Sequence, residues 1–247
     1  MARETGTLDG RVAVVTGASR GIGAAVARRF AAEGAQLILI ARTVGALEEL
    51  DDEIRAGGGH QPVLVPHDLR DFDGLDRLGA SLNERYGKLD ILVGNAGILG
   101  PLTPVGHIPP DAWQEAFDVN VTANYRLIRS LDPLLRLSDA GRAVFVTAAA
   151  AHEHTAYWGL LAATKAALNA LVTSYAAELG KTAVRANLID PGPVRTGFRA
   201  AAFPGEDPAS LPPPEALGDL FVELASPACQ RSGAVVRAPQ VAPSPSR

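Results

Sequence analysis

The stretch TGASRGIG, residues 16–23, lies between the apolar run VAVV and a segment of helical periodicity, residues 21–34. Its glycines at 17, 21 and 23 permit a tight turn and a close approach of the backbone to a phosphate. The N-terminus of the following helix adds N–H groups and the positive end of a dipole. A glycine-rich turn alone is weak evidence, but between a strand and a helix it predicts a dinucleotide site. The alternative is a tight turn without a ligand.

The same alternation of apolar run and helical segment continues along the chain. Six further runs follow VAVV in order, namely LILI, VLV, ILV, AVFV, ANLI and AVV. Continuous apolar runs are typical of parallel strands that helices cover on both faces. The order therefore predicts an α/β fold with a single-domain Rossmann-type doubly wound parallel β-sheet over residues 1–239. Ligands of such sheets bind at the carboxyl ends of the strands.

Three helical or irregular segments complete this outline. A long helix is expected from Asp111 to Leu137, and another over Ala156–Leu171, with Lys165 among small and apolar residues. The Ala- and Pro-rich segment 197–214 is expected to be a long loop, either functional or a poorly ordered connector. The Pro- and Ser-rich end, residues 240–247, is expected to be a disordered tail.

Composition narrows the class of protein. The chain has 247 residues, of which 47% are hydrophobic and 20% charged, with a net charge of −4 and one cysteine. Nucleic acid is excluded as the main partner, because phosphate neutralisation needs clustered basic residues. One cysteine predicts no internal disulfide, and no apolar run approaches the roughly 18 residues that span a bilayer. We expect no secretory leader. We expect a cytoplasmic protein without membrane or metal binding.

Several motifs occur in a fixed order: TGASRGIG, HDL at 67–69, NAG at 95–97, NV at Asn120, TKAAL around Lys165 and DPGPVRT at 190–196. Over residues 9–239 the sequence resembles the short-chain dehydrogenase/reductase family. The resemblance implies an oxidoreductase that binds a nicotinamide dinucleotide along these motifs. The cofactor-binding residues that it implies are Gly17, Ser19, Arg20, Gly21, Ile22, Gly23, Arg42, Asp68, Leu69, Asn95, Ala96, Gly97, Lys165, Pro191, Gly192, Val194 and Thr196.

Charge near the second strand bears on the choice of cofactor. NAD sites of this kind usually place an acid at the end of that strand, where it binds the ribose 2′-hydroxyl. Here the strand ends in Ala41 and Arg42, and Arg20 lies in the glycine-rich loop. Two guanidinium groups suit a 2′-phosphate, so NADP(H) is favoured over NAD(H). The alternative is that both arginines are solvated surface residues.

The catalytic positions depart from the family pattern. The resemblance implies a Ser, a Tyr four residues before a Lys, and a supporting Asn. Asn120 and Lys165 are present, but Leu161 stands at the Tyr position and Ala148 at the Ser position. Neither side chain can donate a proton or a hydrogen bond. Lys165 is expected to hold the nicotinamide ribose, or else to extend out of the helix to solvent.

Other groups could supply the missing proton. Tyr157 lies two helical turns before Lys165, about 12 Å along a helix axis, and is the remaining catalytic candidate after Asn120 and Lys165. His152 and His154 follow the fifth strand and could act as acids near neutral pH, or be exposed loop imidazoles. Thr147 is expected to face away from Ala148, because successive strand residues point to opposite faces.

Three functions remain open. The first is an NADP(H)-dependent carbonyl reductase or alcohol dehydrogenase with an altered proton donor. The second is a non-catalytic NADP(H)-binding protein that acts as a sensor or as an oligomer partner. The third is cofactor-assisted elimination or cyclisation. The resemblance implies a homodimer or homotetramer through the two long helices, where Ala162, Ala166 and Ala170 permit close packing, and the two lost hydroxyls suggest an apolar small-molecule substrate.

Overall fold

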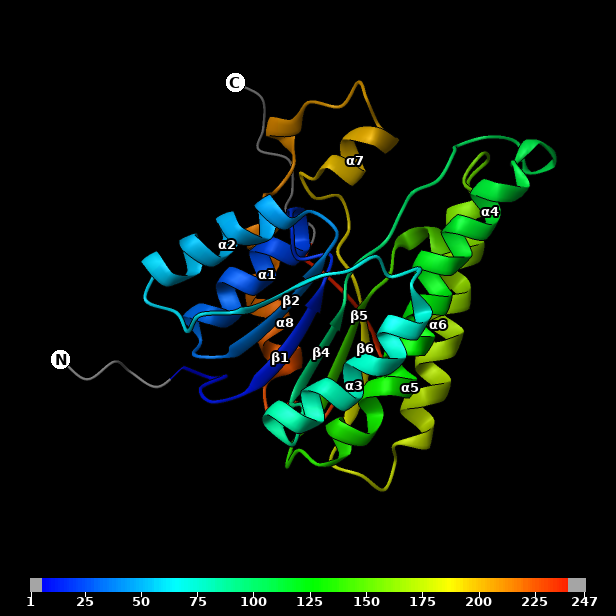
Figure 1. Cartoon of the computed structure of the whole chain (residues 1–247). Helices are drawn as coiled ribbons and strands as arrows, with labels where there is room; N and C mark the ends of the chain where they lie inside the picture. Colours follow the sequence, from blue (N-terminus) through cyan, green and yellow to red (C-terminus); the bar gives the residue numbers. More distant parts are fainter. Residues whose placement is uncertain (1–5, 240–247) are drawn as a thin grey trace.

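Seven parallel strands form one sheet in the computed structural model, which describes residues 6–239 (Figure 1). The predicted tail, 240–247, lies outside the described residues. The strand order is β3-β2-β1-β4-β5-β6-β7, and each neighbouring pair is parallel. The strands are β1 Val12–Thr16, β2 Gln36–Ala41, β3 Val63–Pro66, β4 Ile91–Gly94, β5 Arg142–Val146, β6 Arg185–Asp190 and β7 Val235–Arg237. The predicted fold class and all seven strands are confirmed.

Helices cover both faces of this sheet. They are α1 Gly21–Ala32, α2 Val44–Ala56, α3 Phe72–Tyr86, α4 Pro110–Phe117, α5 Ala123–Arg136, α6 Gly159–Glu178, α7 Gly197–Ala202 and α8 Gly218–Ala225. One apolar core joins the sheet to α1, α2 and α8, and a second joins it to α3, α5 and α6. The strand order reverses between β1 and β4, so the crevice where ligands of such sheets bind lies above these two strands.

The predicted long helix over 111–137 exists, but it is not uniform. Helices α4 and α5 are joined by one π-helical stretch, Asp118–Thr122, which contains Asn120. Single π-turns inside α-helices occur often at functional sites, because the extra residue changes the direction in which side chains point. Among the described residues, no helix is both long enough and apolar enough to cross a bilayer.

The helix that carries Lys165 starts later than the sequence predicts. Helix α6 begins at Gly159, whereas Ala156–Trp158 form a turn before it. Tyr157 has a φ of 72°, in the left-handed region, which a right-handed helix cannot contain. Its carbonyl oxygen accepts a hydrogen bond from the N–H of Thr103 at 3.1 Å, so the turn is tied to the chain after β4. The prediction of a helix from Ala156 is therefore wrong.

The segment 195–211, called the strap below, is more ordered than a long loop. Its helix α7 is capped by the Thr196 hydroxyl, which accepts a hydrogen bond from the N–H of Arg199. Arg199 then pairs with Glu206 at 2.6 Å and stacks on the ring of Phe203 at 3.6 Å. These contacts close the strap on itself and correct the expectation of a structureless connector.

Candidate cofactor crevice and active site

The glycine-rich loop after β1 has a backbone that only glycines can form. Gly17 and Gly21 have φ values of 64° and 56°, in the left-handed region. A Cβ on Gly23 would overlap the carbonyl oxygen of Gly17. Ser19 and Ile22 are half-buried between them. The loop therefore leaves the backbone N–H groups at the start of α1 open to the crevice. Such groups at a helix N-terminus can bind an anion.

Thr16, at the end of β1, ties this loop to the chain after β4. Its hydroxyl donates to the carbonyl of Val93 at 3.2 Å and accepts from the N–H groups of Asn95 and Ala96 at 3.0 and 3.1 Å. The Asn95 amide donates in turn to the carbonyls of Thr16 and Gly17 at 2.9 and 3.3 Å. Thr16 was not among the predicted site residues, although its position directly before the glycines of TGASRGIG could have indicated a role there.

Arginines gather at the far end of the crevice, around β2 and β3. Arg20 and Arg42 are exposed, and among the described residues neither guanidinium group has a hydrogen-bond or ion-pair partner. Asp68 follows β3 and binds Arg70 at 2.7 Å, and this hydrogen bond, with weaker help from the Arg42 charge, lowers the pKa of Asp68 to about 2. Leu69 beside it is 8% exposed. Asp68 is therefore a carboxylate at neutral pH, and two guanidinium groups remain without a protein anion.

The chain after β6 closes the crevice from the other side. Gly192 has a φ of 64°, and its N–H donates to the Asp190 carboxylate at 3.1 Å. Val194 is buried and anchors the turn that leads to Thr196. A Cβ on Gly21 would lie 3.4 Å from the Thr196 methyl group, so the loops after β1 and β6 meet here. Pro191 lies half-buried at the start of this turn.

Lys165 points inward from α6 and is 4% exposed. Its Nζ donates to the carbonyl of Val146, the last residue of β5, at 2.7 Å. Burial lowers the pKa of this ammonium to about 8. A Cβ on Gly97 would lie 3.5 Å from Nζ, so the amine is placed between the ends of β4 and β5. The alternative in which Lys165 extends to solvent is wrong.

Asn120 is fully buried in the π-helical stretch, and its side-chain amide is engaged on three sides. The amide nitrogen donates to the carbonyl of Ile98 at 3.0 Å and to the hydroxyl of Thr164 at 3.1 Å. The amide oxygen accepts from the N–H of Ile98 at 2.8 Å. Asn120 therefore joins the chain after β4 to α6 beside Lys165, and we assign it a positioning role.

The two positions that depart from the family pattern are apolar in the structure as well. Ala148 is half-buried directly beyond β5, two residues after the Val146 carbonyl that binds Lys165. Leu161 is 2% exposed in the first turn of α6, one turn before Lys165.

The candidate replacement donors do not gather around Lys165. Tyr157 is 59% exposed outside α6, and among the described residues its hydroxyl has no hydrogen-bond partner. His152 is exposed and accepts a hydrogen bond from Arg237 at 2.6 Å, while His154 is exposed. The hydroxyl of Thr147 donates to the Asn169 side chain at 2.6 Å, so it is directed to α6, one turn after Lys165, and is already engaged there.

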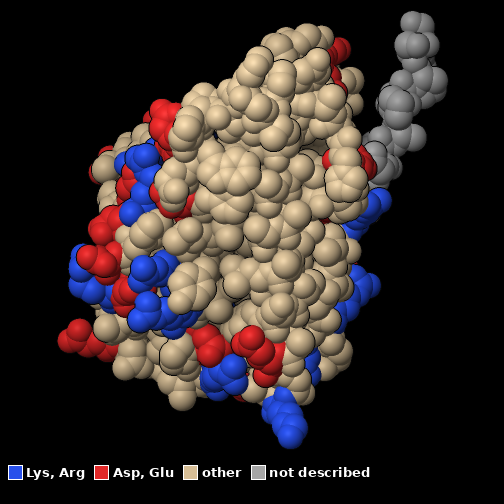
Figure 2. Space-filling model, turned by 90° about the vertical axis from the view of Figure 1, so that its right-hand side faces the viewer, with Lys and Arg blue, Asp and Glu red and all other residues tan. Residues whose placement is uncertain are grey.

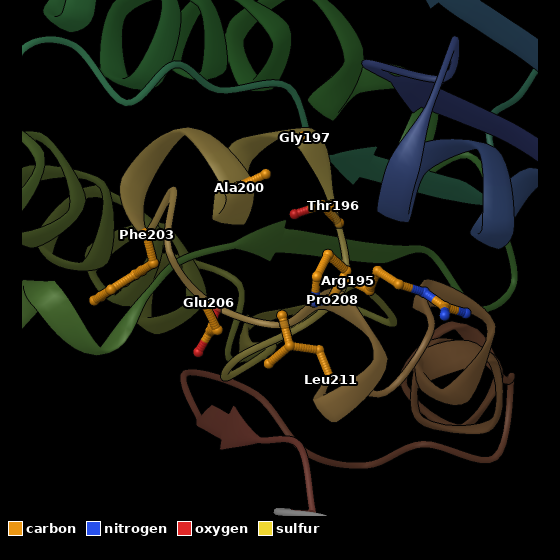
Figure 3. A pocket seen from close by; sticks show the side chains of 8 residues that line it. All are labelled: Arg195, Thr196, Gly197, Ala200, Phe203, Glu206, Pro208 and Leu211. Carbon is orange, nitrogen blue, oxygen red and sulfur yellow. The ribbon is translucent and has the colours of Figure 1, made fainter.

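A small cavity of about 290 Å³ lies inside the strap, next to Thr196 (Figure 3). Both arms of the strap contribute to its lining, which is mainly apolar, with Glu206 as the acid. The ring of Phe203 lies 5.4 Å from that of Trp158, just before α6. The strap therefore contacts the start of the helix that carries Lys165.

No cluster of His, Cys, Asp or Glu within residues 6–239 could hold a metal ion.

Comparisons with known proteins agree with this geometry. A family model described as short chain dehydrogenase matches residues 11–207. The uncharacterized oxidoreductase YciK of Escherichia coli K12 is 36% identical over 88% of this chain and 86% of its own. An NAD-dependent oxidoreductase of Mycobacterium tuberculosis H37Rv, Rv0687, is 35% identical over 79% and 76% of the two chains. A short chain dehydrogenase of Escherichia coli CFT073, solved in complex with NADPH, superimposes with a TM-score of 0.91 at 34% sequence identity. The match covers 95% of this chain and 99% of that one.

Proposed function

The chain belongs to the short-chain dehydrogenase family, and from this premise we propose that it is an NADP(H)-dependent oxidoreductase with an altered proton donor. It reduces a carbonyl, or oxidises an alcohol, on a small and mainly apolar substrate. The observation that carries the proposal is the crevice itself, because its glycine-rich loop, the hydrogen bonds of Thr16 and the buried Lys165 all lie at the ends of β1, β4 and β5.

The residues present fit a dinucleotide. A side chain on Gly23 would fill the turn that the loop keeps open, and the N-terminus of α1 favours an anion. Asn95, Ala96 and Gly97 line the middle of the crevice, and Pro191, Gly192, Val194 and Thr196 close it. When bound, the nicotinamide group supplies or accepts a hydride. The chain's own residues hold the dinucleotide and position the substrate oxygen.

The choice of NADP(H) rests on Arg20 and Arg42. Both guanidinium groups lack a protein anion among the described residues, and β2 ends without an acid that could bind a ribose hydroxyl. A 2′-phosphate provides the anion that both can bind through two parallel hydrogen bonds. The relatives differ, since one solved neighbour is a complex with NADPH and one curated relative is named NAD-dependent.

Ala148 and Leu161 favour a second function, a non-catalytic NADP(H)-binding protein that acts as a sensor or oligomer partner. General acid catalysis typically contributes about 10²–10⁴ to a rate, or about 3–5 kcal/mol of barrier. Loss of both hydroxyls removes that contribution unless another group supplies the proton. The two functions share the crevice, and turnover distinguishes them.

We also propose that the chain forms a homodimer or homotetramer through the side on which α4 and α6 lie. This side shows a broad area without charged side chains, with Lys, Arg, Asp and Glu gathered toward its margins (Figure 2). Between Lys165 and Glu178, α6 has no charged residue, and Ala166 and Ala170 are exposed on it. Small exposed residues permit close helix packing, so a second copy can bury this face.

Two measurements test the proposed function. Fluorescence titration should give a dissociation constant for NADPH at least about tenfold below that for NADH, because a charged bidentate contact contributes about 1.5–3 kcal/mol. Oxidation of NADPH should then be observed with activated ketones and diketones. Binding of neither dinucleotide would refute both functions. Binding without turnover over the whole panel would leave the non-catalytic function.

A further inference from the structure

The amine of Lys165 has hydrogen-bonding capacity that the protein does not use. A lysine ammonium has three N–H donors. Among the described residues, its one hydrogen bond is to the Val146 carbonyl. A buried donor without a partner is unfavourable, so two N–H groups are available for ligands in the crevice. The family resemblance implies that one of these N–H groups binds the ribose of the cofactor. The other N–H group remains available.

The position of this amine suits a hydrogen bond from its remaining N–H group to a substrate oxygen. The Val146 carbonyl places Nζ two residues from Ala148, where the resemblance puts a hydroxyl that would hold the substrate carbonyl. Leu161, where it puts the proton donor, precedes Lys165 by one turn of the same helix. Nζ is thus tied to both apolar positions, to Ala148 through the Val146 carbonyl and to Leu161 through α6.

Competing donors are held elsewhere. The ring of His152 accepts a hydrogen bond from Arg237, and His154 and Tyr157 are exposed on the loop before α6. The Asn120 amide makes three hydrogen bonds and cannot release a proton near neutral pH. Thr164 lies beside it, but its hydroxyl donates to the carbonyl of Leu161.

We propose that Lys165 is itself the proton donor to the substrate, a direct catalytic role that replaces the missing tyrosine. The proposal rests on the proposed reductase function. In reduction, the carbonyl carbon gains the hydride that NADPH gives up, and the carbonyl oxygen gains a proton from Nζ. The products are an alcohol, NADP⁺ and a neutral lysine amine, which regains its proton from solvent. In oxidation, the neutral amine removes the proton of the alcohol.

The surroundings of Lys165 support this role. Its pKa is lowered to about 8 by burial, so the ammonium releases a proton more readily than an exposed lysine does near neutral pH. None of the ionisable side chains on the elements packed against α6 forms an ion pair with Lys165. These side chains are Asp111, Glu115 and Asp118 near α4, Arg126, Arg129, Asp132 and Arg136 on α5, His152, Glu153 and His154 after β5, and Arg185 and Asp190 on β6.

The pH dependence of the unchanged protein is the first test. Reduction needs the ammonium, so kcat/KM should be constant below the pKa and should fall about tenfold per pH unit above about 8. Oxidation needs the neutral amine, so its kcat/KM should rise through the same pH. A break well below or well above pH 8, or a flat profile, would indicate that another group or water supplies the proton. Each of these results would overturn the proposal.

Variants separate proton transfer from cofactor binding. Lys165→Arg keeps the positive charge and the N–H donors but cannot release a proton near neutral pH. Its kcat should fall about 10²–10⁴-fold, while the dissociation constant for NADPH stays within about tenfold. Lys181→Arg, an exposed lysine beyond α6, is the matched control and should keep the wild-type kcat. A Lys165→Arg variant that keeps most of its kcat would show that Lys165 acts only as a fixed charge.

A direct titration needs no turnover. The chain contains lysines only at positions 88, 165 and 181, so Cε signals of ¹³C-labelled lysine can be assigned from single variants. In the complex with NADP⁺, the Lys165 signal should titrate near 8. A Lys165 signal that titrates at 10 or above would refute the proposal. If the wild type binds NADPH but reduces no ketone or diketone of the panel, the proposed reductase function fails. If the wild type reduces these compounds and Lys165→Arg reduces them at the same rate, only the assignment of Lys165 as proton donor fails.

Discussion

The Nζ of Lys165 lies 2.7 Å from the carbonyl oxygen of Val146, so the only buried lysine amine within residues 6–239 is fixed at the end of β5. This bond joins the helix that carries the amine to the strand that leads into Ala148. The bond explains why a lysine is tolerated in an apolar setting, because one N–H donor of Lys165 has a partner. The lower pKa of Lys165 also means that less free energy is needed to bury this side chain in its neutral form.

Burial of Lys165 makes stability depend on pH. Because its folded pKa, about 8, lies below the unfolded value of about 10.4, the unfolded chain binds more protons between these values and stability rises with pH. Relative to Lys165→Met, the free energy of unfolding of the wild type should rise by about 3 kcal/mol between pH 7 and pH 10.5. Urea denaturation without cofactor measures this difference. Parallel stability curves for the two proteins would show that the pKa is normal.

The glycine-rich loop should not accept a side chain at Gly23. In Gly23→Ala the new methyl group overlaps the Gly17 carbonyl, so the turn must open, and such overpacking typically costs about 1–3 kcal/mol. NADPH affinity should fall at least about tenfold. Gly45→Ala is the matched control, because a Cβ there meets no atom within 4 Å. Equal NADPH affinities for the two variants, from fluorescence titration, would remove the loop from the cofactor site.

Arg42 should discriminate between the two dinucleotides. Arg42→Gln removes a charged contact worth about 1.5–3 kcal/mol, so NADPH affinity should fall about 10–150-fold while NADH affinity stays nearly constant. Arg55→Gln, on the exposed side of α2, controls for net charge. If NADPH and NADH affinities fall together, Arg42 does not contact the 2′-phosphate.

Thr16 should be required for the shape of the crevice. Thr16→Val leaves the N–H groups of Asn95 and Ala96 without their acceptor and the Val93 carbonyl without its donor. Each unsatisfied buried group costs about 1–3 kcal/mol, and NADPH affinity should fall with stability. Thr16→Ser keeps the hydroxyl and should behave like wild type in thermal unfolding. A Thr16→Val protein of unchanged stability would contradict the role given to this hydroxyl.

The fold could be predicted from the sequence because its signals are local and repeated. Apolar runs such as LILI and ILV are buried strands in the structure, and TGASRGIG forms a tight turn between a strand and a helix. The network around Thr16 could not be predicted, because residue 16 meets residues 93–96 only after β1 and β4 pair. The start of α6 was misplaced because nothing local shows that Tyr157 adopts a left-handed backbone.

Lys165 illustrates the same limit within the site. The sequence left open whether this side chain is buried or reaches solvent, because a lone lysine among alanines and leucines fits both. The choice depends on the Val146 carbonyl, 19 residues away, which accepts a hydrogen bond from the Lys165 amine. The strap was likewise expected to be a loop, although FRAAA has good helix formers, because its cap and its Arg199–Glu206 pair require the folded turn.

The most direct test compares wild type with the Ala148→Ser/Leu161→Tyr double variant in NADPH oxidation with activated ketones and diketones, after circular dichroism shows both to be folded. We predict that the wild type turns over, with a rate that falls above pH about 8 as Lys165 loses its proton. The double variant, with a hydroxyl donor restored, should turn over at least as fast. Turnover by the double variant alone would contradict the account, because the natural chain would then bind its cofactor without catalysis.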